Sequence, residues 1–267
     1  MQTVLMYAAP SITEEVLLMI SEETRRKLRE LGMDAFVDAL DNQEANLNNY
    51  VTLDFDQRLM IAVDEFYASK NRDRAKRLMH LAKFRFPDAD LGALYYEDRP
   101  INKNEIVALG TCGYISTSTN LVINGYTGSG KTHLSCALGR EACRRLHRTK
   151  YTRMPELLES LNLAMEMNHS ISRMVKKLSN YHLLIIDEWL VDIPSEREVR
   201  FLLEVFEKRY DQWPTLFVTQ YKTAEWHARL GGGVIADAIM DRIVHNCTTI
   251  NLGKTNMRAL FAGRPAD

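Results

Sequence analysis

The chain has 267 residues, a formal net charge of −1, 46% hydrophobic residues and 26% charged residues. This composition excludes a disordered chain, and the near-zero charge excludes a polycation that holds nucleic acid by its overall field. No apolar run is long enough to span a membrane, so we expect no membrane partner. The four cysteines form no C-x-x-C pair and the seven histidines show no metal-ligand spacing, which favours a reduced, cytoplasmic protein without structural zinc.

The first third of the chain shows apolar residues at helical spacing and no strand-like alternation. Leu59, Val63 and Phe66 mark one such helix. Pro87 is expected to stop the last helix of the region. The pattern predicts an all-helical N-terminal domain over residues 1–87, which we expect to bind DNA or a partner.

A run of positive charge lies near the end of this region. Between Lys70 and Arg85 there are seven basic residues and a single acidic one, Asp73. Charge runs usually form a solvated helix face, and that remains the alternative here. Such faces normally mix both signs, whereas contacts with nucleic-acid phosphates need one-signed density. The residues that we predict to bind the DNA backbone are Lys70, Arg72, Arg74, Lys76 and Arg77.

Residues 88–120 contain proline, glycine and a Ser/Thr run at 116–119, and they predict an irregular linker. In many ATPases the segment before the first strand also lines the adenine pocket. Tyr114 and Ile115 are candidates for that role, although packing in the core fits them equally well.

The most specific motif of the chain is Gly125–Thr132, which matches G-x-x-x-x-G-K-[ST] and follows the apolar run Leu121–Ile123. Its glycines let backbone N–H groups approach an anion, and the following helix adds positive charge at its N-terminus. Lys131 is expected to contact the β- and γ-phosphates of ATP, and the Thr132 hydroxyl to ligate Mg²⁺. The predicted nucleotide-binding residues are Gly125, Tyr126, Thr127, Gly128, Ser129, Gly130, Lys131 and Thr132.

Two later strands are predicted to end at the same site. The run Leu183–Ile186 is followed by Asp187 and Glu188, which is typical of a buried parallel strand ending in carboxylates. Asp187 is expected to hold Mg²⁺ through water, and Glu188 to polarise the attacking water. Another strand ends in Thr219 and Gln220, which could hydrogen-bond the γ-phosphate or that water.

Strands and helices alternate from residue 121 to the end, which predicts a parallel α/β ATPase domain over residues 121–267. Arg242 and Arg258 lie in its last part. Arginines accelerate phosphoryl transfer strongly when they reach the γ-phosphate. Spacing alone favours a surface position for both.

With these landmarks in order, the chain resembles the IstB-like ATPases, helper proteins of insertion-sequence transposition within the AAA+ class. The resemblance covers roughly residues 24–260, and bacterial helicase loaders are a similar, more distant group. The segments that resemble family signatures are Leu31–Met33, Phe55–Leu59, Lys131–Leu134, Asp187–Trp189, Glu225–His227, Ala236–Asn246 and Met257–Arg258.

The resemblance implies a P-loop AAA+ core with a parallel sheet flanked by helices, preceded by a small all-helical N-terminal domain. It implies ATP-dependent homo-oligomer assembly on double-stranded DNA and cooperation with a transposase in target-site selection. By position, Arg242 resembles the trans-acting arginine finger and Arg258 the second sensor arginine. Thr219-Gln220 stands where the family usually has Ser-Gln, and Lys254–Asn256 where it has Gly-Glu-Ser.

Other functions are compatible with the same motifs. A helicase loader would use the same machinery on a helicase, and the N-terminal region distinguishes the two because a transposition helper must bind DNA there. A small-molecule phosphotransferase would leave Arg242 and the basic segment without a role. A nucleotide-gated binding module that hydrolyses ATP slowly is the third alternative.

Overall fold

The computed structural model describes residues 20–167 and 169–260. The contacts divide the chain into two compact units that meet in the sequence between Asp73 and Arg74. Residues 1–19 of the predicted helical domain and residues 261–267 of the predicted ATPase domain lie outside the described residues. Within the described ranges, no helix is both long and apolar enough to cross a membrane.

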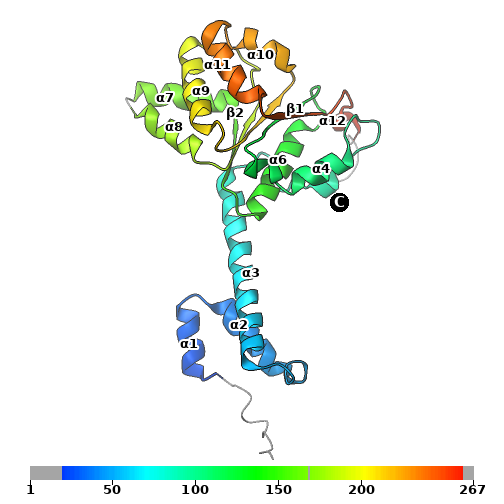
Figure 1. The fold of residues 1–267 in the computed structure, drawn as a ribbon, viewed down its shortest axis with the longest axis vertical. Helices are drawn as coiled ribbons and strands as arrows, with labels where there is room; N and C mark the ends of the chain where they lie inside the picture. The colour runs from blue at the N-terminus through cyan, green and yellow to red at the C-terminus, as the bar shows by residue number, and fades with distance from the viewer. Residues whose placement is uncertain (1–19, 168, 261–267) are drawn as a thin grey trace, which may run out of the picture. The chain divides into compact units, whose positions relative to one another are not determined.

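The first unit is helical in its described part, which confirms the predicted helical N-terminal region (Figure 1). Gly32 has a φ of +70° and separates the first two helices, because it can adopt the left-handed conformation that ends a helix. The helical elements are α1 (Glu22–Glu30), α2 (Asp34–Ala45), η2 (Leu47–Asn49) and the beginning of α3 (Phe55–Ala82).

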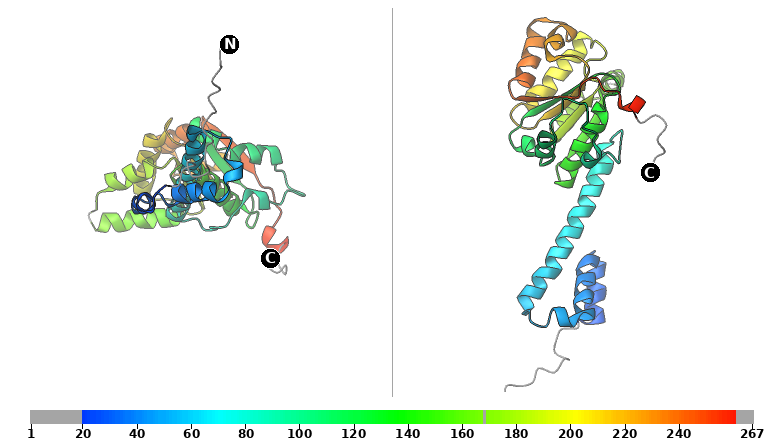
Figure 2. Two further views of the ribbon diagram at one scale, coloured as in Figure 1. Left: turned by 90° about the horizontal axis from the view of Figure 1, so that it is seen from below. Right: turned by 90° about the vertical axis from the view of Figure 1, so that its right-hand side faces the viewer.

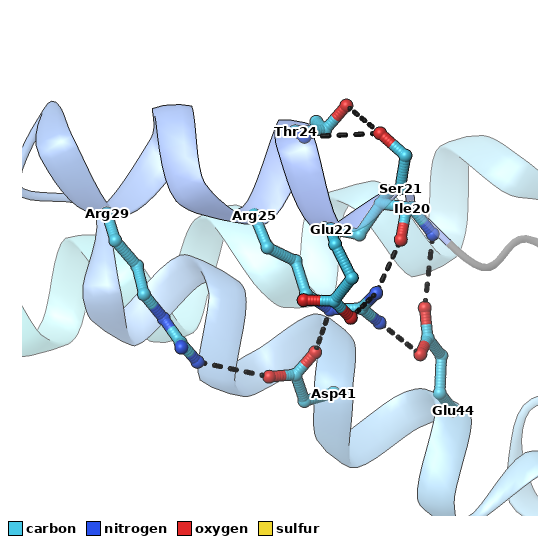
Figure 3. Close-up of polar contacts among 8 residues, drawn as sticks. All are labelled: Ile20, Ser21, Glu22, Thr24, Arg25, Arg29, Asp41 and Glu44. Carbon is cyan, nitrogen blue, oxygen red and sulfur yellow. Dashed lines mark hydrogen bonds and ion pairs between the residues drawn. The ribbon is translucent and has the colours of Figure 1, made fainter.

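Polar contacts hold α1 against α2 (Figure 3). Arg25 of α1 donates from Nε to Asp41 Oδ1 of α2 at 2.8 Å and also pairs with Glu44. The Glu44 carboxylate in turn accepts from the backbone N–H of Ile20 at 3.2 Å. Because α1 has no buried residue of its own, this network supplies much of its attachment to α2.

The second unit is built on a five-stranded sheet in which every neighbouring pair is parallel. Its order, β2-β3-β4-β1-β5, places β3, β4 and β1 side by side in the centre. The strands are β1 (Asn120–Asn124), β2 (Thr149–Arg153), β3 (Leu183–Asp187), β4 (Thr215–Thr219) and β5 (Cys247–Asn251).

Helices cover both faces of the sheet (Figures 1 and 2). Successive strand residues point to opposite faces, so Leu183 and Ile185 pack with one apolar core while Leu184 and Ile186 pack with the other. The first layer contains α4 (Lys103–Gly110), α5 (Gly113–Ser116) and α6 (Lys131–Arg144). The second contains α7 (Met154–Glu166), α8 (Ile171–Ser179), α9 (Glu196–Arg209), α10 (Thr223–Arg229) and α11 (Gly233–Val244).

The predicted central strands and the α/β class are confirmed, but the segment before β1 differs from the irregular linker predicted over residues 88–120. It contains η3 (Leu91–Ala93), α4 and α5, and Ile106 packs in the core beside α6. The glycines that suggested a linker end one helix and begin the next, since Gly110 closes α4 and Gly113 opens α5. Strand β5 was not predicted, because only Ile250 among its residues is buried.

The boundary between the units also differs from the one predicted at residue 87. The compact units divide within α3, and that helix ends at Ala82, ahead of Pro87. Phe84 packs with the core around α6, which ties the residues after the helix to the second unit. The helical pattern of α3 therefore continues across the boundary between the units, and only long-range contacts define where this boundary lies.

Arg209 is a buried structural cation of the second unit, with 2% of its surface exposed. Its guanidinium donates to the carbonyl oxygens of Leu178 at 2.9 Å, Tyr181 at 2.8 Å and Pro214, and to the Thr215 hydroxyl at 2.9 Å. Burial lowers the pKa of Arg209 to about 9, which leaves it charged at neutral pH. One side chain thus joins the end of α8, the start of β3 and the start of β4.

We predict that Arg209→Ala lowers the free energy of unfolding by about 2–5 kcal/mol, because several buried acceptors lose their donor. Arg200→Ala, which removes an exposed arginine paired with Glu196 on α9, should cost less than about 1 kcal/mol. Urea unfolding of the two variants measures the difference. Equal losses would contradict the structural role of Arg209.

Candidate nucleotide site

The phosphate loop joins β1 to α6 and includes two glycines in the left-handed region. Gly128 and Gly130 have φ values of +83° and +86°. A Cβ at Gly128 would lie 2.3 Å from Asn256 Oδ1, so both the conformation and the space require glycine there. In the part of the chain that the structure describes, the N–H groups of Gly128 and Gly130 find no acceptor. They are therefore free to bind an anion.

Lys131 is the first residue of α6 and lies over the loop. Its Nζ donates to the carbonyl oxygens of Gly125 at 2.7 Å and Tyr126 at 2.9 Å. Burial lowers the pKa of Lys131, while the charge of Asp187 raises this pKa and that of Arg258 lowers it. Lys131, Asp187 and Arg258 come from distant parts of the sequence, and their charges are close enough to interact.

A cavity of about 630 Å³ opens between these groups. It brings together most of the residues that the sequence predicted for the nucleotide. Gly125 and Tyr126 do not line it, and they contribute through the carbonyl groups that hold Lys131. The predicted residues that line the cavity are Thr127, Gly128, Ser129, Gly130, Lys131, Thr132, Asp187, Glu188, Thr219, Gln220 and Arg258.

Asp187 ends β3 with 2% of its surface exposed. Its Oδ2 accepts from the Tyr151 hydroxyl at 2.7 Å, and its Oδ1 accepts from the Glu188 N–H at 2.8 Å. Burial and the charge of Asp187 raise the pKa of Tyr151, so the phenol stays a donor. Both carboxylate oxygens are thus oriented by neighbours, and Asp187 lines the same cavity as Thr132.

Glu188 follows in a left-handed conformation, with a φ of +57°. Arg153 Nη2 donates to its carboxylate at 2.6 Å, and Arg85 Nη1 lies 3.6 Å from it. The hydrogen bond that Arg153 donates to Glu188 raises the pKa of Arg153. Sequence reasoning missed both arginines, because Arg153 reaches Glu188 only through the pairing of β2 with β3, in which it lies opposite Asp187.

Thr219 ends β4 and Gln220 follows it, but the two side chains contact different groups. The buried Thr219 hydroxyl donates to the carbonyl of Trp189 at 2.9 Å and accepts from the Tyr221 N–H at 3.1 Å. Gln220 Oε1 accepts from the Thr127 hydroxyl of the phosphate loop at 3.4 Å. Thr219 therefore holds the turn after β3, and Gln220 is the residue of the pair that reaches the phosphate side.

The segment that precedes α4 also lines the cavity. Phe86, Ala93, Leu94 and Tyr95 lie there. Tyr114 and Ile115, the candidates from sequence, are instead buried in the core beside α6. The lining residues lie in loops and η3 and show no periodicity, so no local pattern could have selected them.

Two predicted sets lie outside this cavity. Arg242 on α11 donates from Nη1 to the carbonyl of Ala238 at 2.8 Å and pairs with Glu207. The predicted DNA-binding residues lie on α3, where Lys70 donates to the carbonyl of Gly32 at 2.7 Å. Arg258, by contrast, is the second residue of the last described helix, α12 (Met257–Leu260), and lines the cavity.

Comparison with known proteins agrees with this geometry. A family model described as "IstB-like ATP binding protein" matches residues 26–261. The insertion sequence ATP-binding protein y4uH of Sinorhizobium fredii is 32% identical over 246 residues, which span 91% of this chain and 97% of that protein.

Solved structures share the fold. The DnaC helicase loader matches with a TM-score of 0.52 and 18% identity, over 64% of this chain and 99% of the loader. AMPPCP-bound DnaA from Aquifex aeolicus matches with a TM-score of 0.54 and 17% identity, over 64% of this chain and 52% of DnaA. At these identities the likeness shows a common α/β AAA+ fold.

We predict that Lys131→Ala weakens ATP binding by about 10- to 100-fold, because it removes a charge-assisted contact with the phosphates. Titration with a fluorescent ATP analogue measures the affinity. Lys208→Ala on α9 removes an exposed lysine far from the loop in sequence and outside the cavity lining, and it should bind as the parent does. If Lys131→Ala bound the ATP analogue as tightly as the parent does, the assignment of this cavity to nucleotide phosphates would be wrong.

Proposed function

This chain belongs to the family of IstB-like ATP binding proteins, and from that premise we propose that it is an ATP-hydrolysing helper of transposition. It assembles on double-stranded DNA and cooperates with a transposase in choosing the insertion site. The observation that supports hydrolysis is the meeting of a glycine loop, Lys131, Asp187 and Glu188 at one cavity. The relative y4uH is an insertion sequence ATP-binding protein, which supports transposition as the setting.

The motif residues of the cavity have separate parts in the proposed reaction. Lys131 and the loop N–H groups bind the β- and γ-phosphates, and Glu188 orients the attacking water. A hydroxyl and a carboxylate that line one cavity suit Mg²⁺, so Thr132 and Asp187 would hold it, where it would neutralise phosphate charge. Arg153 already binds the Glu188 carboxylate, so a water that Glu188 orients has to share this carboxylate with Arg153 or displace Arg153 from it.

Arg242 acts in this proposal on the nucleotide of a neighbouring copy. It does not line the cavity of its own chain, and its guanidinium is held by Glu207 on α9 with 24% of its side chain exposed. An arginine that supports phosphoryl transfer must reach the γ-phosphate, so Arg242 needs a second subunit to do so. This reasoning implies an ATP-dependent homo-oligomer.

The basic part of α3 is the proposed DNA-binding surface. Arg72, Arg74, Lys76 and Arg77 are exposed, and none forms an ion pair with any other residue in 20–167 or 169–260. The α-helical period puts Arg74 and Arg77 within about 60° of each other on the side of Lys70, with Arg72 and Lys76 on the opposite side. A single duplex can therefore contact one of these two groups at a time.

A helicase loader remains the second candidate, because the DnaC helicase loader shares the fold. Its 18% identity shows fold alone, whereas the insertion sequence relative is 32% identical over 91% of this chain. Sequence similarity over nearly the whole chain therefore favours the transposition helper. Co-precipitation with the transposase or with a replicative helicase separates the two.

We predict that Glu188→Gln binds ATP as the parent does and hydrolyses it about 10²- to 10⁴-fold more slowly, because the amide keeps the shape and loses the basic oxygen. The matched control is Glu156→Gln, since Glu156 is the other carboxylate bound to Arg153. This control should hydrolyse at nearly the parental rate. Phosphate release measures both, and normal turnover in Glu188→Gln would mean that another residue orients the water.

We also predict that Arg74→Ala with Arg77→Ala flattens the log–log salt slope of duplex binding by roughly two units, since each neutralised phosphate contributes about 0.9. Arg72→Ala with Lys76→Ala removes the same charge from the opposite side of α3 and should change the slope less. Salt titrations with an ATP analogue present measure both slopes. Parental slopes in both variants would show that α3 is a solvated helix and that DNA is bound elsewhere.

A further inference from the structure

We propose that Arg99 is a positioning residue for phosphate binding: its guanidinium fixes the peptide between Ser129 and Gly130 so that the Gly130 N–H faces the phosphates. The proposal rests on the nucleotide site described above and adds to it a residue outside every motif. Arg99 lies in the loop between η3 and α4, and it lines the cavity.

The contact joins two segments through one planar group. Arg99 Nη2 donates to the carbonyl oxygen of Ser129 at 2.6 Å, and Nη1 donates to the carbonyl oxygen of Tyr95 at 2.8 Å. Tyr95 belongs to the loop that lines the cavity, and Ser129 belongs to the phosphate loop. The guanidinium fork therefore joins two segments that line the cavity, with fixed geometry.

The planarity of the peptide turns this contact into control of a phosphate ligand. In a trans peptide the C=O and the following N–H point in opposite directions. When Arg99 holds the Ser129 carbonyl, it also sets the direction of the Gly130 N–H. That N–H has no acceptor among the described residues, and it belongs to the loop that precedes the N-terminus of α6. It is thus available to an anion.

Gly130 is the residue at which this control matters. Its φ of +86° is reached easily by glycine, which also makes its backbone free to rotate. A Cβ at this position would come within 3.9 Å of Arg99 Nη2, so the guanidinium lies directly beside the backbone that it restrains. An outside donor supplies the rigidity that the loop lacks by itself.

The charge of Arg99 is also explained by this role. Its guanidinium has carbonyl partners and no carboxylate partner within the described chain, and its buried Nε has no hydrogen bond there. Burial lowers the pKa of Arg99, which reflects the cost of keeping an unpaired cation out of water. A phosphate chain bound in the same cavity would offset that cost.

The loop that carries Arg99 is itself held from the C-terminal side. The Thr255 hydroxyl donates to the carbonyl of Asp98 at 3.1 Å, and Pro100 packs against Gly253, where a Cβ would meet Pro100 Cδ at 2.7 Å. The carbonyl of Gly253 accepts from the Tyr126 N–H at 3.2 Å. Arg99 therefore sits in a loop with fixed neighbours, as a positioning residue must.

The decisive variant is Arg99→Lys, which keeps the positive charge but loses the planar two-pronged guanidinium that holds the Tyr95 and Ser129 carbonyl groups in fixed geometry. We expect it to raise the Kd of fluorescent ADP and ATP analogues about tenfold, the loss of one oriented charge-assisted contact. The KM for hydrolysis should rise with the Kd, and kcat should stay within about twofold, since the N–H contact is made equally before and during reaction. The melting temperature should stay close to that of the parent.

Two further variants complete the test. Arg99→Ala should weaken binding at least as much as Arg99→Lys, and Arg148→Ala should bind as the parent does, because Arg148 donates to the carbonyl of Asn180 outside the cavity. Parental affinity in Arg99→Lys would overturn the proposal, as would a fall in kcat without a change in Kd. If Lys131→Ala also bound nucleotide normally, the site assignment itself would fail, which separates the two failures.

Discussion

The site depends on the parallel order of the sheet. Parallel strands all bring their carboxyl ends to one edge, and a ligand binds in the crevice outside that edge. Here β3, β4 and β1 are neighbours, so the residues after them meet although they are far apart in sequence. The phosphate loop follows β1, Asp187 and Glu188 follow β3, and Gln220 follows β4. A different strand order would leave the same motifs apart.

The sheet supplies only part of the cavity, and segments outside it complete the rest. The chain before β1 contributes Arg85, Arg99 and Tyr95, and the chain after β5 contributes Arg258. Together they surround the cavity with more positive than negative side chains, which suits a polyphosphate. The contacts of Thr255 with Asp98 and of Met257 with Gly128 join these segments to each other and to the loop. Nucleotide binding and the order of these segments are therefore linked.

The two units are stabilised by different interactions. The second has two apolar cores on opposite faces of one sheet. In the first, α1 buries no residue and is attached through Arg25 and its carboxylate partners on α2. Ion pairs weaken with salt while apolar burial does not, so the attachment of α1 is the more sensitive to ionic strength. The stability of the helical unit proposed to bind DNA therefore depends on salt through these ion pairs.

The sequence by itself determined the α/β class, the central strands and most of the cavity residues, because each is encoded locally. A glycine loop between an apolar run and a helix predicts a phosphate loop without any knowledge of tertiary contacts. Two acids after four aliphatic residues likewise predict a buried strand that ends in carboxylates. Tertiary structure alone decided that Arg85, Arg99 and Arg153 lie at the site. It also decided that residues 88–120 pack in the core and that Arg242 does not line the cavity. These depend on strand register and on contacts between distant loops, and a side chain at a strand end or in a loop has no periodicity that reveals its partner.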